Sequence, residues 1–152
     1  MHSQKKTVHP FKILSVNHVG VVTKASFDAV NFFEKVLGLD FKGIEEINDQ
    51  QTRVTVLEIN PGDNSDPNSR IEILEPQGGK GPIASFINKK GVGIHHLALT
   101  VDCIDKAIKF LVLQGVQMID EKPRKGANQS KIAFIHPHST GGILLELVEN
   151  TC

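Results

Sequence analysis

Apolar residues along the chain change between strand-like runs and helical spacings, and this change occurs twice. The runs 16–21 and 94–99 are uncharged and rich in branched aliphatic residues, which is typical of buried strands. Each run is followed by apolar residues at helical spacing that end at a glycine, Gly38 in the first half and Gly115 in the second. The two halves of the chain therefore start with the same strand–helix pattern.

Three further strand-like segments follow the helix in each half. They lie near residues 40–47, 51–60 and 69–75 in the first half, and near 116–120, 130–136 and 142–149 in the second. We expect Ser26 and Asp102 to be the N-caps of the two helices. This order predicts an α+β fold made of tandem βαβββ repeats.

The repeat also defines the expected domain organisation. The predicted parts are an N-terminal tail over 1–12 and one domain over 13–149, divided into repeat one (about 13–76), a linker (77–92) and repeat two (about 93–149). The linker has glycines and a short helical segment near 83–89. A turn-forming run at 60–68 accounts for the small difference in repeat length.

Each repeat has a histidine on its first strand and a glutamate on its last. His18 and His96 are 78 positions apart, and Glu72 and Glu146 are 74 positions apart. If the repeats pack around a pseudo-two-fold axis, these four side chains converge on a cleft. Two imidazoles and two carboxylates suit a divalent ion such as Co²⁺, Mn²⁺, Ni²⁺, Zn²⁺ or Mg²⁺.

The alternative is that these residues are structural or exposed to solvent. Against this, period-2 alternation sets Glu72 and Glu146 on the face opposite their apolar neighbours. Four polar groups buried without a shared partner would be costly. Glu75 and Glu149 lie three residues further along, and we expect them to face solvent.

Two other histidine motifs are given structural roles. His95 must point away from His96 on a strand, so we interpret it as a structural or interface residue. His136 and His138 flank a proline and precede Ser-Thr-Gly-Gly, which indicates a turn rather than a metal site.

Composition excludes several classes of function. Lys plus Arg and Asp plus Glu number 17 each, so no basic excess favours nucleic acid or acidic lipid. No apolar run is long enough to span a membrane, and the N-terminus has no signal-peptide core. The two cysteines, Cys103 and Cys152, fit a reducing compartment, so we expect a cytoplasmic protein.

Several motifs together resemble the methylmalonyl-CoA epimerases of the vicinal oxygen chelate (glyoxalase-like) superfamily. The resembling segments are 16–21, 32–33, 37–39, 71–76, 82–87, 91–98, 121–127, 134–137 and 142–147. The resemblance covers about residues 13–149 and implies a metal held by His18, Glu72, His96 and Glu146. It further implies an isomerase of propionate metabolism that interconverts (R)- and (S)-methylmalonyl-CoA through a metal-stabilised enolate, with Co²⁺ as the expected metal and a homodimer as the expected assembly.

The resemblance also assigns roles around the substrate. Glu146 is the expected base, while Thr55 stands where some relatives have a second catalytic glutamate, so the opposite-face acid is not identified. A basic rim is expected to bind the phosphates of coenzyme A, and its residues are Lys122, Arg124 and Lys125. The alternatives are a glyoxalase I-type isomerase and a metal-free ligand-binding protein of the same fold. No other cofactor, nucleic acid or membrane partner is expected.

Overall fold

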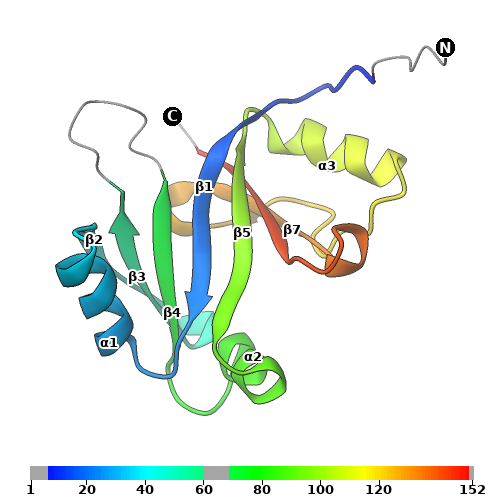
Figure 1. Cartoon of the computed structure of the whole chain (residues 1–152). Helices are drawn as coiled ribbons and strands as arrows, with labels where there is room; N and C mark the ends of the chain where they lie inside the picture. The colour runs from blue at the N-terminus through cyan, green and yellow to red at the C-terminus, as the bar shows by residue number, and fades with distance from the viewer. Residues whose placement is uncertain (1–6, 60–68, 151–152) are drawn as a thin grey trace, which may run out of the picture. The chain divides into compact units, whose positions relative to one another are not determined.

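The structure is a computed structural model that describes residues 7–59 and 69–150 (Figure 1). The turn-forming run expected at 60–68 lies outside this range. In the first half the elements are β1 (Ile13–Val22), α1 (Ser26–Asn31) with a π-helical turn (Phe32–Val36), β2 (Asp40–Ile47), β3 (Thr52–Glu58) and β4 (Arg70–Pro76). The rest of the chain has α2 (Pro82–Lys90), β5 (Gly93–Val101), α3 (Ile104–Leu113), β6 (Arg124–Lys125), β7 (Lys131–Ile135) and β8 (Leu145–Glu149). The predicted α+β order βαβββ is confirmed in both halves.

The chain forms two compact units. One contains Ser15–Ala98, and the other contains Met1–Leu14 together with Leu99–Cys152. A single domain over 13–149 stays a prediction. No helix in the described part of the chain is long and apolar enough to cross a membrane.

The unit of residues 15–98 is built on β2, β3, β4 and β1, which lie side by side in this order (Figure 1). The β2–β3 and β3–β4 pairs are antiparallel, and β1 pairs with β4 in parallel. Helix α1 packs against β3 and β4, and α2 also packs against β4. The core between the sheet and α2 is formed by Val22, Val54, Val56, Leu74 and Ile83.

The other unit has an apolar core between α3 and the antiparallel strands β7 and β8. Its buried members are Val101, Ile104, Ala107, Ile108, Ala133, Ile135 and Leu147. The helical spacing that predicted α3 is therefore the spacing that buries one face of the helix.

The predicted N-caps of α1 and α3 are wrong. The hydrogen bonds expected from them are made instead by Glu75 and Glu149, which were expected to face solvent. Neither Ser26 nor Asp102 is an N-cap; the caps are Ala25 and Cys103, and neither makes a side-chain hydrogen bond. The Glu75 carboxylate accepts the amide of Ser26, and the Glu149 carboxylate accepts the amide of Ile104 at 2.6 Å. The start of a helix has unpaired N–H groups and a partial positive charge, which attract a carboxylate from the neighbouring strand.

The strand expected near 116–120 does not form. The amides of Ile119 and Asp120 both donate to the Phe134 carbonyl, while the Asp120 carboxylate accepts the Phe134 amide at 2.9 Å. These bonds replace a regular ladder, and only an isolated bridge joins Met118 to Ile135. The strand that pairs with β7 on the side away from β8 is instead the two-residue β6.

Candidate metal centre and active site

His18 on β1 and His96 on β5 face each other inside the unit of residues 15–98. Their Nε2 atoms are 2.8 Å apart, and the two rings are nearly perpendicular, with centroids 4.9 Å apart. Each residue is 5% exposed. The uncharged runs that predicted buried strands therefore carry two buried imidazoles with one nitrogen of each pointing at the same place.

Glu72 on β4 provides the third donor. It is paired in register with Gly20 on β1, and its Oε2 atom lies 3.2 Å from Nε2 of His18. Its side chain is 13% exposed. The parallel β1–β4 pairing thus brings together residues that are far apart in the sequence, and the convergence expected of His18, Glu72 and His96 is found.

Both histidines use their other ring nitrogen for a hydrogen bond to the preceding residue. Nδ1 of His18 lies 2.7 Å from Oδ1 of Asn17, and Nδ1 of His96 lies 2.9 Å from Nδ1 of His95. The amide oxygen of Asn17 can only accept, so Nδ1 of His18 carries a proton, while its Nε2 contacts Nε2 of His96 and Oε2 of Glu72. His95 also contacts the ring of Phe86 on α2 at 4.8 Å between centroids.

Gly20 provides the space in which the His96 ring lies. A Cβ atom at this position would be 2.2 Å from Cε1 and 2.5 Å from Nδ1 of His96. Any side chain on Gly20 would therefore displace the ring. This role of Gly20 was not predicted, although a glycine inside an apolar strand is a signal of close approach by another group.

The donor set fits a divalent ion. Imidazole nitrogen and carboxylate oxygen bind such ions at about 2.0–2.2 Å, so two donors at right angles on one ion lie about 3 Å apart. The Nε2–Nε2 distance of 2.8 Å and the Nε2–Oε2 distance of 3.2 Å match this spacing. Two imidazoles and a carboxylate, all largely removed from solvent, also have the chemistry of a site for Co²⁺, Mn²⁺, Ni²⁺ or Zn²⁺.

Glu146 belongs to the other compact unit. It lies on β8, in register with Phe134 on β7, and is 6% exposed. Period-2 alternation predicted that Glu146 would be buried on the side opposite its neighbour Leu147. Within its own repeat it occupies the place that Glu72 has on β4.

Thr55 on β3 is buried, with 2% exposure. It pairs with Ile73 on β4, so its side chain lies on the face that α1 covers, opposite to Glu72. Val56 pairs with Glu72, and Val54 pairs with the neighbouring Leu74. Two β3 residues on the Glu72 face are therefore valines, and the carboxylate that β3 adds to this face, Glu58, is paired with Lys42 and Arg70 at 3.6 and 3.7 Å.

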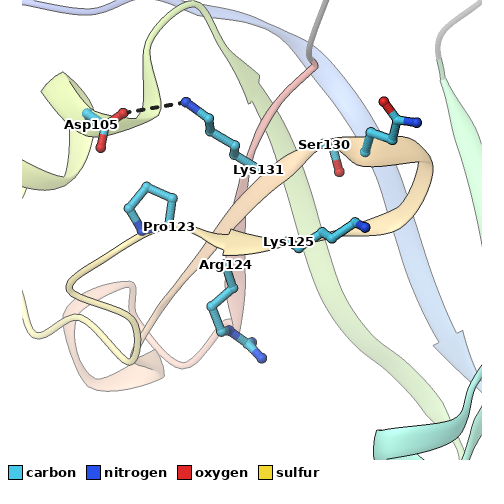
Figure 2. Close-up of a pocket in the computed structure, with 7 residues that line it drawn as sticks. Asp105, Pro123, Arg124, Lys125, Ser130 and Lys131 are labelled. Carbon is cyan, nitrogen blue, oxygen red and sulfur yellow. Dashed lines mark ion pairs between the residues drawn. The ribbon is translucent and has the colours of Figure 1, made fainter.

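Part of the expected basic rim lines a cavity of about 540 Å³ in the unit that contains α3. Arg124, Lys125 and Lys131 are among its lining residues, whereas Lys122 is exposed outside it. Figure 2 shows that Lys131 points toward Asp105, at 3.8 Å, and that Arg124 and Lys125 point in different directions.

The charge at this cavity is partly compensated. The Arg124 guanidinium lies 2.9 Å from the Asp120 carboxylate and 5.6 Å from the centroid of Phe134. Lys125 is the cross-strand neighbour of Lys131, and like charges in this position repel one another. A bound anion would relieve that repulsion.

The turn expected around His136 and His138 forms. Residues Pro137–Ser139 form a single 3₁₀ turn, and the amide of His138 donates to Nδ1 of His136 at 3.0 Å. Nδ1 of His136 thus stabilises the turn.

Comparison with protein families gives one family model over most of the chain. The model of the Glyoxalase/Bleomycin resistance protein/Dioxygenase superfamily matches residues 17–134. Among curated proteins, the chain is 37% identical over 134 residues to the uncharacterized protein YqjC of Bacillus subtilis, covering 88% of this chain and 91% of that protein. It is 36% identical over 135 residues to the mitochondrial methylmalonyl-CoA epimerase of Dictyostelium discoideum, covering 88% of this chain and 77% of that protein.

Solved structures give the same result. The methylmalonyl-CoA epimerase of Mycobacterium tuberculosis superposes with a TM-score of 0.83 at 31% identity, covering 97% of this chain and 95% of that one. A methylmalonyl-CoA epimerase in complex with methylmalonyl-CoA and NH4+ superposes with a TM-score of 0.83 at 26% identity, covering 93% and 97%.

Proposed function

This chain belongs to the Glyoxalase/Bleomycin resistance protein/Dioxygenase superfamily and, within it, to the methylmalonyl-CoA epimerases, which are isomerases of an acyl-CoA, and from this premise we propose that it interconverts (R)- and (S)-methylmalonyl-CoA. The observation that carries the proposal is that Nε2 of His18 lies 2.8 Å from Nε2 of His96 and 3.2 Å from Oε2 of Glu72, so that donors from three strands meet at His18. A metal-free binding protein has no need of three buried donors with this spacing.

The reaction requires a divalent ion, which we propose is held by His18, Glu72, His96 and Glu146. Support for the first three comes from their donor distances, and support for Glu146 comes from its burial and its place in the repeat. When bound, the ion would supply positive charge beside the negative charge that develops on the substrate as the α-proton leaves. We propose Co²⁺ as the physiological ion, with Mn²⁺, Ni²⁺, Zn²⁺ and Mg²⁺ as the alternatives to be compared.

Glu146 is the proposed base that removes the α-proton. A carboxylate with 6% exposure is shielded from water, and one oxygen of such a group remains available for a proton while the other binds a cation. Val54 and Val56 occupy the β3 positions level with Leu74 and Glu72, and Glu58, further along the same face of β3, is already paired with Lys42 and Arg70.

The phosphates of coenzyme A are proposed to meet the basic rim of Lys122, Arg124 and Lys125. Support comes from the cavity that Arg124 and Lys125 line and from the like charges that face each other across β6 and β7. Phosphate oxygens form charge-assisted hydrogen bonds with lysine and arginine side chains. We also propose that the protein works as a homodimer, and its cytoplasmic location stays a prediction.

The test separates metal binding from proton removal. Glu146→Gln keeps an amide oxygen that can bind metal but has no useful basicity, so it should retain Co²⁺ and lose about 10²–10⁴-fold in rate. Glu72→Gln is the matched control, because this side chain is proposed to act as a ligand alone, and its loss of rate should be much smaller. Both variants are loaded with Co²⁺, their occupancy is measured, and deuterium incorporation into methylmalonyl-CoA from deuterated water is compared.

Two results would contradict the proposal. If Glu146→Gln exchanges the α-proton nearly as fast as the parent, Glu146 is not the base. If the parent isomerises the hemithioacetal of methylglyoxal and glutathione faster than it epimerises methylmalonyl-CoA, the glyoxalase I-type alternative replaces the proposed activity.

A further inference from the structure

The residues directly before the two histidines have a shared arrangement that the proposed reaction does not explain. Asn17 precedes His18 on β1, and His95 precedes His96 on β5. Each contacts Nδ1 of the following histidine, at 2.7 Å for Asn17 Oδ1 and 2.9 Å for His95 Nδ1. The first strands of both repeats therefore place a polar partner behind each imidazole, on the side away from Nε2.

A neutral imidazole has one proton for two nitrogens, and only the unprotonated nitrogen can bind a metal ion. At His18 the proton is on Nδ1, because the Asn17 amide oxygen can only accept. At His96 either nitrogen of the Nδ1–Nδ1 contact can be the donor. When His96 donates through Nδ1, its Nε2 carries no proton and can bind an ion at the place where it contacts Nε2 of His18 at 2.8 Å.

From this geometry we propose that His95 is a positioning residue: it accepts the Nδ1 proton of His96 and so holds the ring with Nε2 ready to bind the divalent ion. Asn17 likewise accepts the Nδ1 proton of His18 and orients that ring. The proposal rests on the metal site of the proposed function, but it concerns binding of the ion and is independent of the substrate. A hydrogen-bond acceptor behind a metal-binding histidine fixes both the tautomer and the orientation of the ring.

His95 is itself held in place by its surroundings. The His95 ring contacts the Phe86 ring, with centroids 4.8 Å apart and an interplanar angle of 69°. The ammonium of Lys90 in turn lies 5.9 Å from the centroid of the Phe86 ring. On the far side, Gly20 lets the backbone of β1 approach the His96 ring. The His96 imidazole is thus bounded by His95, Gly20 and His18, and little other freedom remains to it.

The repeat itself suggests the test. His95→Asn gives the second repeat the acceptor that the first repeat has in Asn17, whereas His95→Phe keeps an aromatic ring beside Phe86 but has no acceptor. Zn²⁺ affinity is measured by competition with a chelator, and unfolding of the ion-free variants by urea reports on the fold. The ring ¹⁵N shifts of His96 in the Zn²⁺-loaded protein identify which nitrogen carries the proton. His138→Asn and His138→Phe are matched controls on an exposed turn.

We expect His95→Phe to weaken Zn²⁺ binding by about 10–100-fold, and His95→Asn to recover most of that loss. The loaded parent should show His96 protonated on Nδ1 and bound through Nε2. Equal Zn²⁺ affinity in the parent and His95→Phe, equal loss in both His95 variants, or a proton on Nε2 of His96 in the loaded parent would overturn the proposal.

These outcomes differ from a failure of the proposed function. A parent protein that binds Zn²⁺ as expected but does not epimerise methylmalonyl-CoA refutes the activity and leaves the role of His95 standing. A parent that binds no divalent ion through His96 overturns the role of His95 directly.

Discussion

Substitution of Gly20 by alanine should displace the His96 imidazole. The new Cβ would lie 2.2 Å from Cε1, 2.5 Å from Nδ1 and 2.8 Å from Nε2 of His96. Carbon atoms in contact are normally about 3.5–4.0 Å apart, so the ring and the strand must separate by about 1.3 Å or more. Gly20 has no left-handed backbone angle, so alanine meets no backbone strain and the whole effect comes from this overlap.

The expected size of the effect follows from two opposing contributions. Overpacking a buried site costs about 1–3 kcal/mol, and removal of a glycine from a strand returns about 0.5–1 kcal/mol. The free energy of unfolding should therefore fall by about 1 kcal/mol for mid-range values, and by no more than about 2.5 kcal/mol. Displacement of Nε2 by about 1 Å exceeds the roughly 0.5 Å that a binding site tolerates, so Zn²⁺ affinity should fall at least about 10-fold.

A double-mutant cycle with His96→Ala tests the cause. When the ring is absent, Gly20→Ala should cost nothing or stabilise the protein by up to about 1 kcal/mol. Urea unfolding of the four ion-free proteins measures the coupling, and chelator competition measures Zn²⁺ affinity in the two that keep His96. Gly79→Ala is the control, because a Cβ there would meet no atom within 4 Å. An equal cost of Gly20→Ala with and without the His96 ring would refute the steric argument.

Three further outcomes are expected. Glu149→Ala should lower the free energy of unfolding by about 1 kcal/mol, because the Ile104 amide at the start of α3 loses its carboxylate partner; a change within error in urea titration would contradict this. Lys125→Glu should raise KM for methylmalonyl-CoA several-fold and preserve kcat, whereas the exposed Lys109→Glu on α3 should change neither; the steady-state rates decide. Light scattering should give a mass near twice 16.7 kDa, because Val92 and Ile94 beside the site are 58% and 70% exposed and would be covered in a dimer. A monomer at micromolar concentration would refute the proposed homodimer.

The βαβββ repeat could be predicted because it follows from the spacing of apolar residues within short segments. Strands with alternating or continuous apolar residues and helices with 3.6-residue spacing are properties of short segments, so both βαβββ halves could be predicted. The same reasoning placed His18, Glu72 and His96 on buried faces, since the side-chain period of a strand decides its two sides. It failed near residues 116–120, where the Asp120 carboxylate takes the place of a backbone partner.

The roles of Glu75 and Glu149 were not predictable from periodicity. Alternation predicts that the Glu75 and Glu149 side chains lie on the face of the sheet opposite to Glu72 and Glu146, but it does not predict which element covers that face. The structure puts the first amides of α1 and α3 there, and both carboxylates accept a hydrogen bond from a helix start. For the same reason the face on which Thr55 lies could not be predicted, because it depends on the register between β3 and β4.

The sequence by itself determined the two-fold βαβββ pattern, the buried strands and the residue types of a divalent-metal site, because each of these depends on neighbours a few positions apart. Tertiary structure alone decided that two Nε2 atoms meet at 2.8 Å, that Gly20 admits the His96 ring, and that Asn17 and His95 lie behind the imidazoles. These features depend on strand register and on the approach of segments far apart in the chain. A shift of one residue in that register would turn every one of these side chains to the other face of the sheet.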